Sequence, residues 1–382
     1  MKLIKRLITH LHPHLDEYLA EYIARKFGIL EFHFTSNFQH HEITCAGVGN
    51  VADGQLDSLF IGVGGGPFDD HGRNSGYSSA ELMVQYLGLE DDPRLITLIR
   101  AVTIQDKQGK KSKDFNTLPI AINNMHRYGY SSDEIRQWVF QAFDSIIESE
   151  ALLLDDIKQG VSKTVMVKEN RQAEIRVRFL KEKRSWFYFQ LFHIATLMGE
   201  SGKDWNEFGE KAFQKQAIAF RKAKPVAKSH CNLAMTRFGE MHLMVIDGSA
   251  GQFSEFEIEL DSCSRINEVG ADVVLLRNSR GHTLVSANKK AAIKVDDFYT
   301  LLCQTESESR GKKSDDVWYK HEGVSRIYNG TLTRPDVDFT ELEFEEIKSL
   351  LFSWLEVRAV TVSDFEEGVD VATAFDKTAS AG

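Results

Sequence analysis

Cysteine is scarce in this sequence of 382 residues, and its few cysteines lie far apart. They form no C-x-x-C pair: Cys45, Cys231, Cys263 and Cys303. This spacing excludes a zinc ribbon and a small disulfide-stapled fold, because both need closely spaced cysteines. Widely separated cysteines are typical of a reducing compartment, and we expect the protein to be cytoplasmic.

Long hydrophobic runs are also missing, so the sequence predicts no membrane span. The N-terminal segment MKLIKRLITH is basic and partly apolar, but histidines follow where a signal peptide needs a small-residue cleavage site. Basic residues are fewer than acidic ones, and the net charge is −10. That charge disfavours a protein that coats nucleic acid, but it is compatible with a nuclease that uses a local basic groove and metal ions.

Two common catalytic signatures are missing as well. The sequence has no G-x-S-x-G elbow and no G-K-[ST] phosphate loop. A dinucleotide fingerprint beginning at Gly62 would need glycine at the position of Pro67. We therefore expect neither a covalent serine nucleophile nor a bound dinucleotide.

The length favours two domains, and 42% hydrophobic residues allow sizeable cores. Predicted strands at 2–9, 31–38 and 58–64 alternate with helices that begin near Leu15, Ser78 and Asp92. The last of these helices has Pro93 in its first turn. This alternation predicts an α/β fold with a mainly parallel sheet and flanking helices.

Beyond this region the pattern changes twice. Residues 1–130 are expected to form the α/β domain, and 131–229 a helical connector whose last helix ends at Pro225. Residues 230–357 are expected to form a smaller α+β domain. The acidic and then small polar tail, 358–382, is expected to be disordered.

Three histidines and two acids crowd residues 8–17, ITHLHPHLDE, just before the first predicted helix. His10, His14 and Asp16 stand where a strand gives way to a helix, and parallel sheets gather functional groups at the carboxyl ends of their strands. Imidazole and carboxylate are ligands of Mn, Fe, Co and Zn. We predict metal binding by these residues, with exposed loop histidines as the alternative. If Pro13 kinks the turn, the side chain of His12 does not point the same way as those of His10 and His14. We therefore expect His12 to face solvent or to lie behind the metal ligands.

A second candidate is the glycine-rich stretch GVGGGPFDDHG, residues 62–72. Its glycines allow the chain to pass close to a ligand, and Asp69, Asp70 and His71 at its end are then candidate ligands. An ordinary Gly/Pro/Asp turn is the alternative. Asp106 ends an apolar helix and, taken alone, predicts only a cap or a surface residue.

Taken in order, TH-LHPH-LDE-YLA, FDDHG, SSAELM and QDKQG resemble the motifs of the DHH-type phosphoesterase superfamily. The pattern is most similar to the predicted metal-dependent hydrolases that include the melanocyte-proliferating-gene exonucleases. The resemblance covers about residues 1–130 and consists of short motifs rather than long identity. It implies two divalent ions, Mn or Mg, that polarise a phosphate and activate water.

The resemblance also assigns residues. It implies that the first motif supplies His10, His14 and Asp16, and that the triplet and the fourth motif supply Asp69, Asp70, His71 and Asp106. His71 would lie nearest the substrate phosphate, with Asp70 as its catalytic partner.

Two departures from the family pattern matter. Gly62 stands where the family has a strand-end aspartate that bridges the ions, and the triplet is D-D-H rather than D-H-H. One metal, a different second site and no activity all remain open. Asp69 or Asp70 supplying the lost carboxylate from a shifted position is a further alternative.

The C-terminal half contains a basic predicted hairpin around a glycine turn. Arg280, His282 and Lys289 are candidates for gripping a substrate anion through charge-assisted hydrogen bonds. A solvated hairpin is the alternative.

These patterns predict a divalent-metal-dependent phosphoester hydrolase with its site between two domains. Its expected partners are a phosphorylated small molecule or a short oligonucleotide and no membrane, and a homo-oligomer stays open. The alternatives are a catalytically degraded sensor or scaffold that binds metal or nucleotide, and a protein that binds no metal.

Overall fold

The computed structural model describes residues 1–43, 52, 54–71, 74, 76–108, 116–158, 185–248, 270–278, 281–288, 293–311, 317–320, 325–330 and 339–361. The chain divides into two compact units. Described residues up to Ile218 belong to the N-terminal unit, and those from Ala219 to Asn329 and from Phe339 onward belong to the C-terminal unit. The predicted disordered tail, 358–382, is wrong at its start, because Ala359–Thr361 form a strand that pairs with residues 233–235. The rest of this tail, 362–382, lies outside the described residues.

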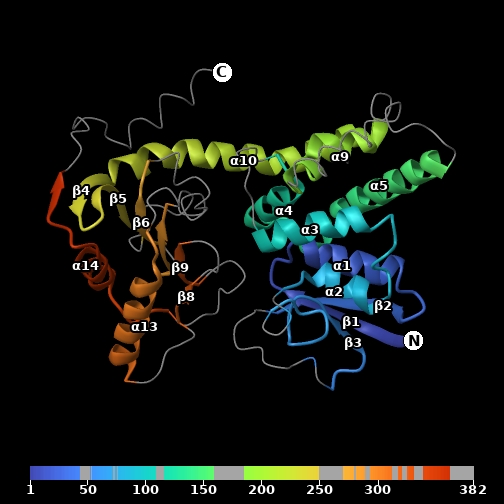
Figure 1. Ribbon diagram of the computed structural model, residues 1–382, viewed down its shortest axis with the longest axis horizontal. Helices are drawn as coiled ribbons and strands as arrows, with labels where there is room; N and C mark the ends of the chain where they lie inside the picture. The colour runs from blue at the N-terminus through green and yellow to red at the C-terminus, as the bar shows by residue number, and fades with distance from the viewer. Residues whose placement is uncertain are drawn as a thin grey trace. The chain divides into compact units, whose positions relative to one another are not determined.

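The N-terminal unit contains a parallel three-stranded sheet with the order β2-β1-β3 (Figure 1). Its strands are β1 (Lys2–His10), β2 (Phe32–Ile43) and β3 (Ser58–Phe60). The predicted parallel sheet is confirmed. The third strand is shorter than predicted because the backbone leaves the extended region at Gly62, whose φ is 70°. All three strands point the same way, so their carboxyl ends share one edge of the sheet.

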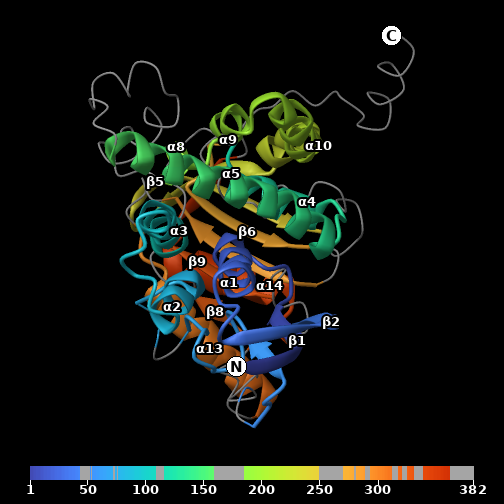
Figure 2. The same ribbon diagram turned by 90° about the vertical axis from the view of Figure 1, so that its right-hand side faces the viewer.

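Helices of the N-terminal unit lie in layers over the sheet. Figures 1 and 2 show α1 (Leu15–Lys26) and α2 (Ser79–Tyr86) next to the sheet, with later helices farther from it. The later elements are α3 (Ile96–Gln108), α4 (Leu118–Arg127), α5 (Ser132–Lys158), α8 (Ser185–Tyr188), α9 (Leu191–Leu197), the 3₁₀ turn η2 (Gly199–Ser201) and α10 (Gly202–Ser229).

Two predicted helix ends were wrong, and both involve proline. α3 begins at Ile96, because residues 93–95 form turns and leave Pro93 outside the helix. α10 continues through Pro225 to Ser229. A proline removes one backbone hydrogen bond without always ending a helix, so the following residues of α10 stay helical.

The core of the N-terminal unit is built on α1. Leu19 and Ile23 are completely buried among side chains that include Leu7 of β1 and Phe143 of α5. A buried ion pair joins α1 to α5, because Arg136 Nε of α5 donates to Glu21 Oε2 of α1 at 2.7 Å. These contacts fix α1 against both the sheet and α5, and none of them involves a candidate site residue.

The C-terminal unit contains a seven-stranded mixed sheet with the order β10-β4-β5-β6-β7-β9-β8. Among the described strands of this second sheet, only β5 and β6 pair in parallel. The strands are β4 (Cys231–Thr236), β5 (Gly239–Asp247), β6 (Val273–Arg277), β7 (Thr283–Ala287), β8 (Tyr319–Lys320), β9 (Arg326–Asn329) and β10 (Ala359–Thr361).

Both faces of this second sheet are covered. Val273 and Leu275 of β6 pack in the same cluster as Phe298 of α13 (Asp296–Arg310) and Leu351 of α14 (Phe344–Leu355). The alternate residues of β6 join a separate cluster that includes Ala227 of α10. This two-sided burial explains why β6 is apolar from Val273 to Leu276, and the predicted α+β character of this region is confirmed.

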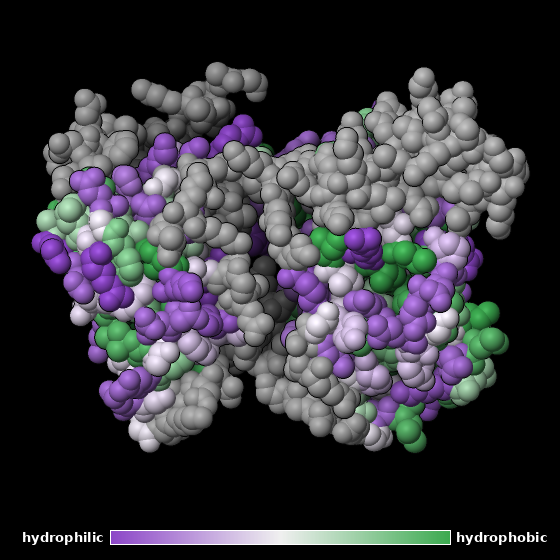
Figure 3. Space-filling view, in the orientation of Figure 1, coloured by the Kyte–Doolittle hydropathy of each residue, from purple (hydrophilic) through white to green (hydrophobic). Residues whose placement is uncertain are grey.

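On the face shown in Figure 3, hydrophilic and hydrophobic residues are intermixed over the described surface of each unit. Within the described ranges, no helix combines the length and the hydrophobicity that crossing a membrane requires.

We expect Leu19→Ala to lower the free energy of unfolding of the N-terminal unit by about 2–5 kcal/mol, because it leaves a cavity in a core that is completely packed. Leu30→Ala is the matched control, since Leu30 is 82% exposed, and its effect should stay within about 0.5 kcal/mol. Urea unfolding followed by circular dichroism measures both, and equal effects of the two substitutions would contradict the packing described.

Candidate metal centre

The site begins where β1 ends and α1 starts. β1 ends at His10, and His14 is the N-cap residue of α1. The backbone amide of His14 donates to Glu17 Oε2 at 2.6 Å. Asp16 and Glu17 both lie in the first turn, where the partial positive charge of a helix N-terminus favours acidic side chains. One short turn therefore carries histidines and carboxylates to the carboxyl edge of the sheet.

His10, His14 and Glu17 form the first candidate ligand cluster, with one ligand atom of each within 4.8 Å of the others. His10 Nδ1 lies 3.0 Å from the carbonyl oxygen of Leu11, which fixes the ring proton on Nδ1. His10 Nε2 then presents a lone pair, and it lies 3.0 Å from Glu17 Oε2. Two acceptors at this distance require a proton or a cation between them.

Without an ion, the electrostatics of this pair favour the uncharged form of each group. Burial, and next the proximity of His14, lower the pKa of His10 well below its ordinary value, so the ring is neutral at physiological pH. Burial, and next the charge of Asp16, raise the pKa of Glu17. Glu17 Oε1 is buried without a hydrogen-bond partner. An orphaned carboxylate oxygen beside a neutral imidazole fits a divalent ion, because imidazole and carboxylate are ligands of this type.

The glycine-rich turn after β3 carries the second cluster, Asp69, Asp70 and His71. Asp69 holds this turn together: its carboxylate accepts from the backbone amides of Gly65 at 2.7 Å and His71 at 3.0 Å. It also accepts from His71 Nδ1 at 2.9 Å. Asp69 therefore orients His71 while standing within reach of an ion.

The carboxylates of Asp16, Asp70 and Asp106 form the third cluster and come from three different segments. The start of α2 positions two of them: the backbone amide of Ser79 donates to Asp16 at 3.3 Å, and its hydroxyl donates to Asp70 at 3.0 Å. Burial, then repulsion from Asp106 and Asp70, raises the pKa of Asp16, and burial and Asp70 raise that of Asp106. The negative charge gathered by Asp16, Asp70 and Asp106 makes this cluster a candidate site for a cation.

A lysine already supplies one positive charge to the third cluster. Lys107 Nζ lies 3.1 Å from Asp70 Oδ2 and 3.1 Å from Asp106 Oδ2. Its side chain is partly exposed, so water screens part of this attraction. Lys107 therefore neutralises one side of the cluster, and Asp16 is left to face the histidine cluster.

Every metal ligand predicted from the sequence falls into one of these three clusters: His10, His14, Asp16, Asp69, Asp70 and Asp106. His12 belongs to none of the three clusters. It has a φ of 58°, its backbone amide donates to Glu42 at 3.1 Å, and its ring lies 4.9 Å from that of His126.

The predicted substrate-binding residues are only partly described. Arg280 and Lys289 lie outside the described residues. His282 lies in the turn between β6 and β7. Its backbone amide donates to Asn278 Oδ1 at 2.9 Å, and its ring stacks on that of Phe339 with 5.0 Å between the ring centroids.

Sequence reasoning missed Glu17 and Lys107. Glu17 adjoins Asp16 in the same motif, and successive helical residues point about 100° apart, so each can serve a different cluster. Lys107 adjoins Asp106 in the same way. Adjacency to a predicted ligand was the available signal in both cases.

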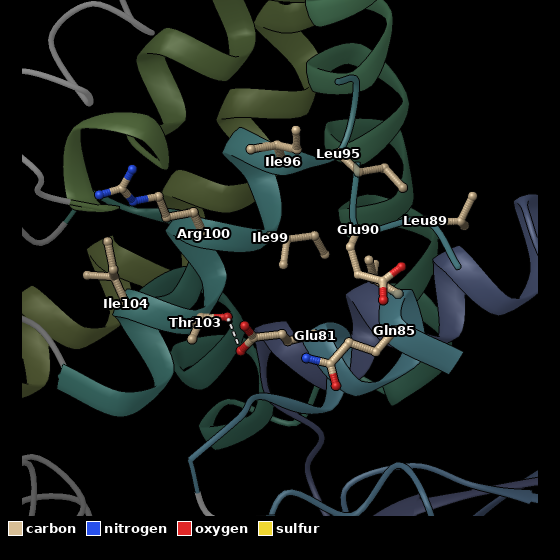
Figure 4. A pocket seen from close by; sticks show the side chains of 11 residues that line it. Glu81, Gln85, Leu89, Glu90, Leu95, Ile96, Ile99, Arg100, Thr103 and Ile104 are labelled. Carbon is tan, nitrogen blue, oxygen red and sulfur yellow. Dashed lines mark hydrogen bonds between the residues drawn. The ribbon is translucent and has the colours of Figure 1, made fainter. Parts of the chain in front are cut away.

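A pocket of about 390 Å³ lies between α2 and α3, apart from the three clusters (Figure 4). Glu81 accepts from Thr103 at 3.3 Å inside it, and Thr103 contacts Ser78, the N-cap residue of α2. The pocket thus adjoins the helix whose first turn positions Asp16 and Asp70.

We expect Mn²⁺ to raise the melting temperature more at pH 8 than at pH 5. The raised pKa values of Glu17, Asp16 and Asp106 mean that folding without metal favours their protonated forms, so metal-free stability falls as pH rises from about 4 through those raised values. An ion requires the deprotonated forms and reverses this loss. Differential scanning fluorimetry with and without Mn²⁺ measures it, and an equal shift at both pH values would contradict the cluster's role.

His71 should titrate with a pKa of about 9 in metal-free protein, because its hydrogen bond to Asp69 stabilises the imidazolium. Its contribution to stability is complete below the ordinary histidine pKa and is lost as pH rises through about 9. Asp69→Asn should return the pKa towards its ordinary value. NMR titration of the imidazole ring measures this, with the exposed His41 as an internal control, and an unchanged His71 pKa in the variant would contradict the assignment.

No family model matches the chain, and no curated protein matches it. Its fold aligns with the crystal structure of an uncharacterized protein from Helicobacter pylori G27 over 92% of this chain and 99% of that chain. The two sequences are 10% identical, and the TM-score is 0.23. A likeness this weak supports no conclusion about function, so the site has to be judged from its own geometry.

Proposed function

We propose that this protein is a divalent-metal-dependent phosphoester hydrolase of the DHH type, with Mn²⁺ or Mg²⁺ as its ion. The observation that carries the proposal is the 3.0 Å approach of His10 Nε2 to Glu17 Oε2 at the end of β1, beside the buried Glu17 Oε1 that has no hydrogen-bond partner. The three-carboxylate cluster beside it adds support, because carboxylate-rich sites favour these ions.

Two ion positions follow from the clusters in this proposal. His10, His14 and Glu17 would hold one ion, and Asp16, Asp70 and Asp106 would hold the other. Asp16 and Glu17 are adjacent, so one helical turn serves both positions. Bound ions would supply positive charge to the phosphate and lower the pKa of water.

The chain's own residues have the remaining roles. Water oxygen forms the new bond to phosphorus, and Asp70 accepts the proton that water loses. The bond from phosphorus to the ester oxygen breaks, and the leaving oxygen takes a proton from His71. His71 suits this role because it is exposed, because Asp69 orients its Nδ1, and because its pKa of about 9 keeps it protonated at neutral pH.

The substrate in this proposal is a phosphorylated small molecule or a short oligonucleotide, acted on in the cytoplasm. The exposed rings of His14 and His71 open the clusters to solvent, which suits a ligand that arrives from outside. A role for Arg280, His282 and Lys289 in gripping this substrate remains a prediction.

One observation favours a second candidate, a protein that binds an ion or nucleotide without turnover. Lys107 Nζ lies between Asp70 and Asp106, where its ammonium group competes with an ion for the same oxygens. A chain with only one ion position would retain binding and lose the two-ion chemistry.

We expect Mn²⁺-dependent hydrolysis of bis(p-nitrophenyl) phosphate or of short RNA, abolished by a chelator. His71→Ala should lower kcat by about 10²–10⁴-fold, because it removes a proton donor. It should leave Mn²⁺ content unchanged, since the other clusters remain. Steady-state kinetics and elemental analysis measure the two quantities.

His41→Ala is the matched control, because His41 is an exposed histidine outside the three clusters, and its activity should equal that of the unaltered protein. Bound Mn²⁺ without turnover on phosphodiesters, RNA or phosphomonoesters would favour the binding protein instead. Absence of both bound Mn²⁺ and bound Mg²⁺ would overturn the hydrolase and the ion-binding protein alike.

A further inference from the structure

The position of Gly62 is filled by another residue's side chain. Gly62 follows β3 at the carboxyl edge of the sheet, and its φ is 70°. A Cβ atom built on Gly62 would lie 2.3 Å from Glu17 Oε1 and 2.9 Å from Glu17 Cδ. These distances are far below any real contact, so the carboxylate of Glu17 and a side chain at position 62 exclude each other.

The position of the Glu17 carboxylate is energetically unfavourable for its ionised form. The residue is 2% exposed, its Oε2 accepts from the His14 amide, and its Oε1 has no hydrogen-bond partner. Burying an ionised oxygen without a partner is strongly unfavourable. In its ionised form the Glu17 side chain therefore needs a compensating positive charge at this position.

Nearby cations do not supply that charge. Lys107 Nζ contacts Asp70 and Asp106, and the buried Arg136 contacts Glu21 and Asp133. His10, the nearest ring, presents a lone pair rather than a proton, because its proton is directed at Leu11. Among the described contacts, the Glu17 carboxylate therefore faces acceptors and one backbone amide.

We infer that Glu17 is the carboxylate that replaces the missing strand-end carboxylate, binding a divalent ion together with His10 and His14, and that Gly62 is a glycine in order to admit it. This inference rests on the metal site of the proposed function but not on hydrolysis. In this inference the carboxylate comes from the first turn of α1 instead of the end of β3. Asp69 and Asp70 are less suitable replacements, because the oxygens of Asp69 already accept from backbone amides of the turn and those of Asp70 accept from Ser79 and Lys107.

The test is Mn²⁺ binding by the full-length chain, measured by isothermal titration calorimetry and elemental analysis. Glu17→Gln keeps the shape of the side chain and an acceptor for the His14 amide, and it removes the charge. We expect a Kd for Mn²⁺ at least about tenfold weaker. Metal-free Glu17→Gln should melt no lower than metal-free unaltered protein, because the neutral amide still accepts from the His14 backbone and can donate to His10 Nε2, and this separates loss of a ligand from misfolding.

A reciprocal exchange makes the test specific. Gly62→Asp should weaken Mn²⁺ binding because the new side chain overlaps Glu17, whereas the double variant Glu17→Ala/Gly62→Asp should bind Mn²⁺ more tightly than Glu17→Ala alone. Gly88→Asp is the matched control, since Gly88 has a φ of 65° and open space around it, and it carries the same backbone strain without the overlap. Its Kd should be unchanged.

Glu31→Gln, at an exposed glutamate, controls for loss of charge and should also leave the Kd unchanged. Glu17→Gln that binds Mn²⁺ as tightly as the unaltered protein overturns this inference and leaves the proposed function standing. Unaltered protein that binds no Mn²⁺ overturns the inference and the proposed function together.

Discussion

The 3.0 Å contact between His10 Nε2 and Glu17 Oε2 is the constraint on which the rest of the site depends. A hydrogen bond to the Leu11 carbonyl turns the lone pair of His10 inward, and a bond from the His14 amide fixes the Glu17 carboxylate opposite it. Both groups are buried, and burial alone would keep them neutral. A proton shared by the two groups satisfies them in the metal-free protein, and in the proposed site a divalent ion replaces that proton, so the local fold and the proposed metal binding are linked.

The scaffold explains how this contact is held. β1 ends at His10, and a turn of four residues leads into α1, whose buried face packs on the sheet and on α5. The buried ion pair between Glu21 of α1 and Arg136 of α5 adds a polar contact to this packing. Displacing α1 would therefore expose a large core, so the first turn of this helix provides a rigid base for ligands that come from β1 and from the turn after β3.

Much of this organisation could be predicted from local patterns. The spacing of Leu15, Tyr18, Leu19, Tyr22 and Ile23 predicted α1, and alternation of strands and helices predicted the parallel sheet that gathers His10 and Asp70 at one edge. The role of Glu17 could not be predicted in this way. That role depends on the space left by the missing side chain of Gly62, which the Glu17 carboxylate occupies. This space is set by the positive φ of Gly62 and by the packing of β3 beside β1. The late start of α3 and the passage of α10 through Pro225 were missed because proline was given too much weight.

Crystals of the full-length protein grown with Mn²⁺ offer the most direct test of the central claim, through anomalous scattering near the manganese absorption edge. We predict a strong anomalous peak bounded by His10, His14 and Glu17, with Glu17 Oε1 or Oε2 as a ligand. A second peak among Asp16, Asp70 and Asp106 would accompany it if Lys107 is displaced. Ordered His10 and Glu17 side chains in the present arrangement, with no anomalous peak between them at saturating Mn²⁺, would contradict the claim.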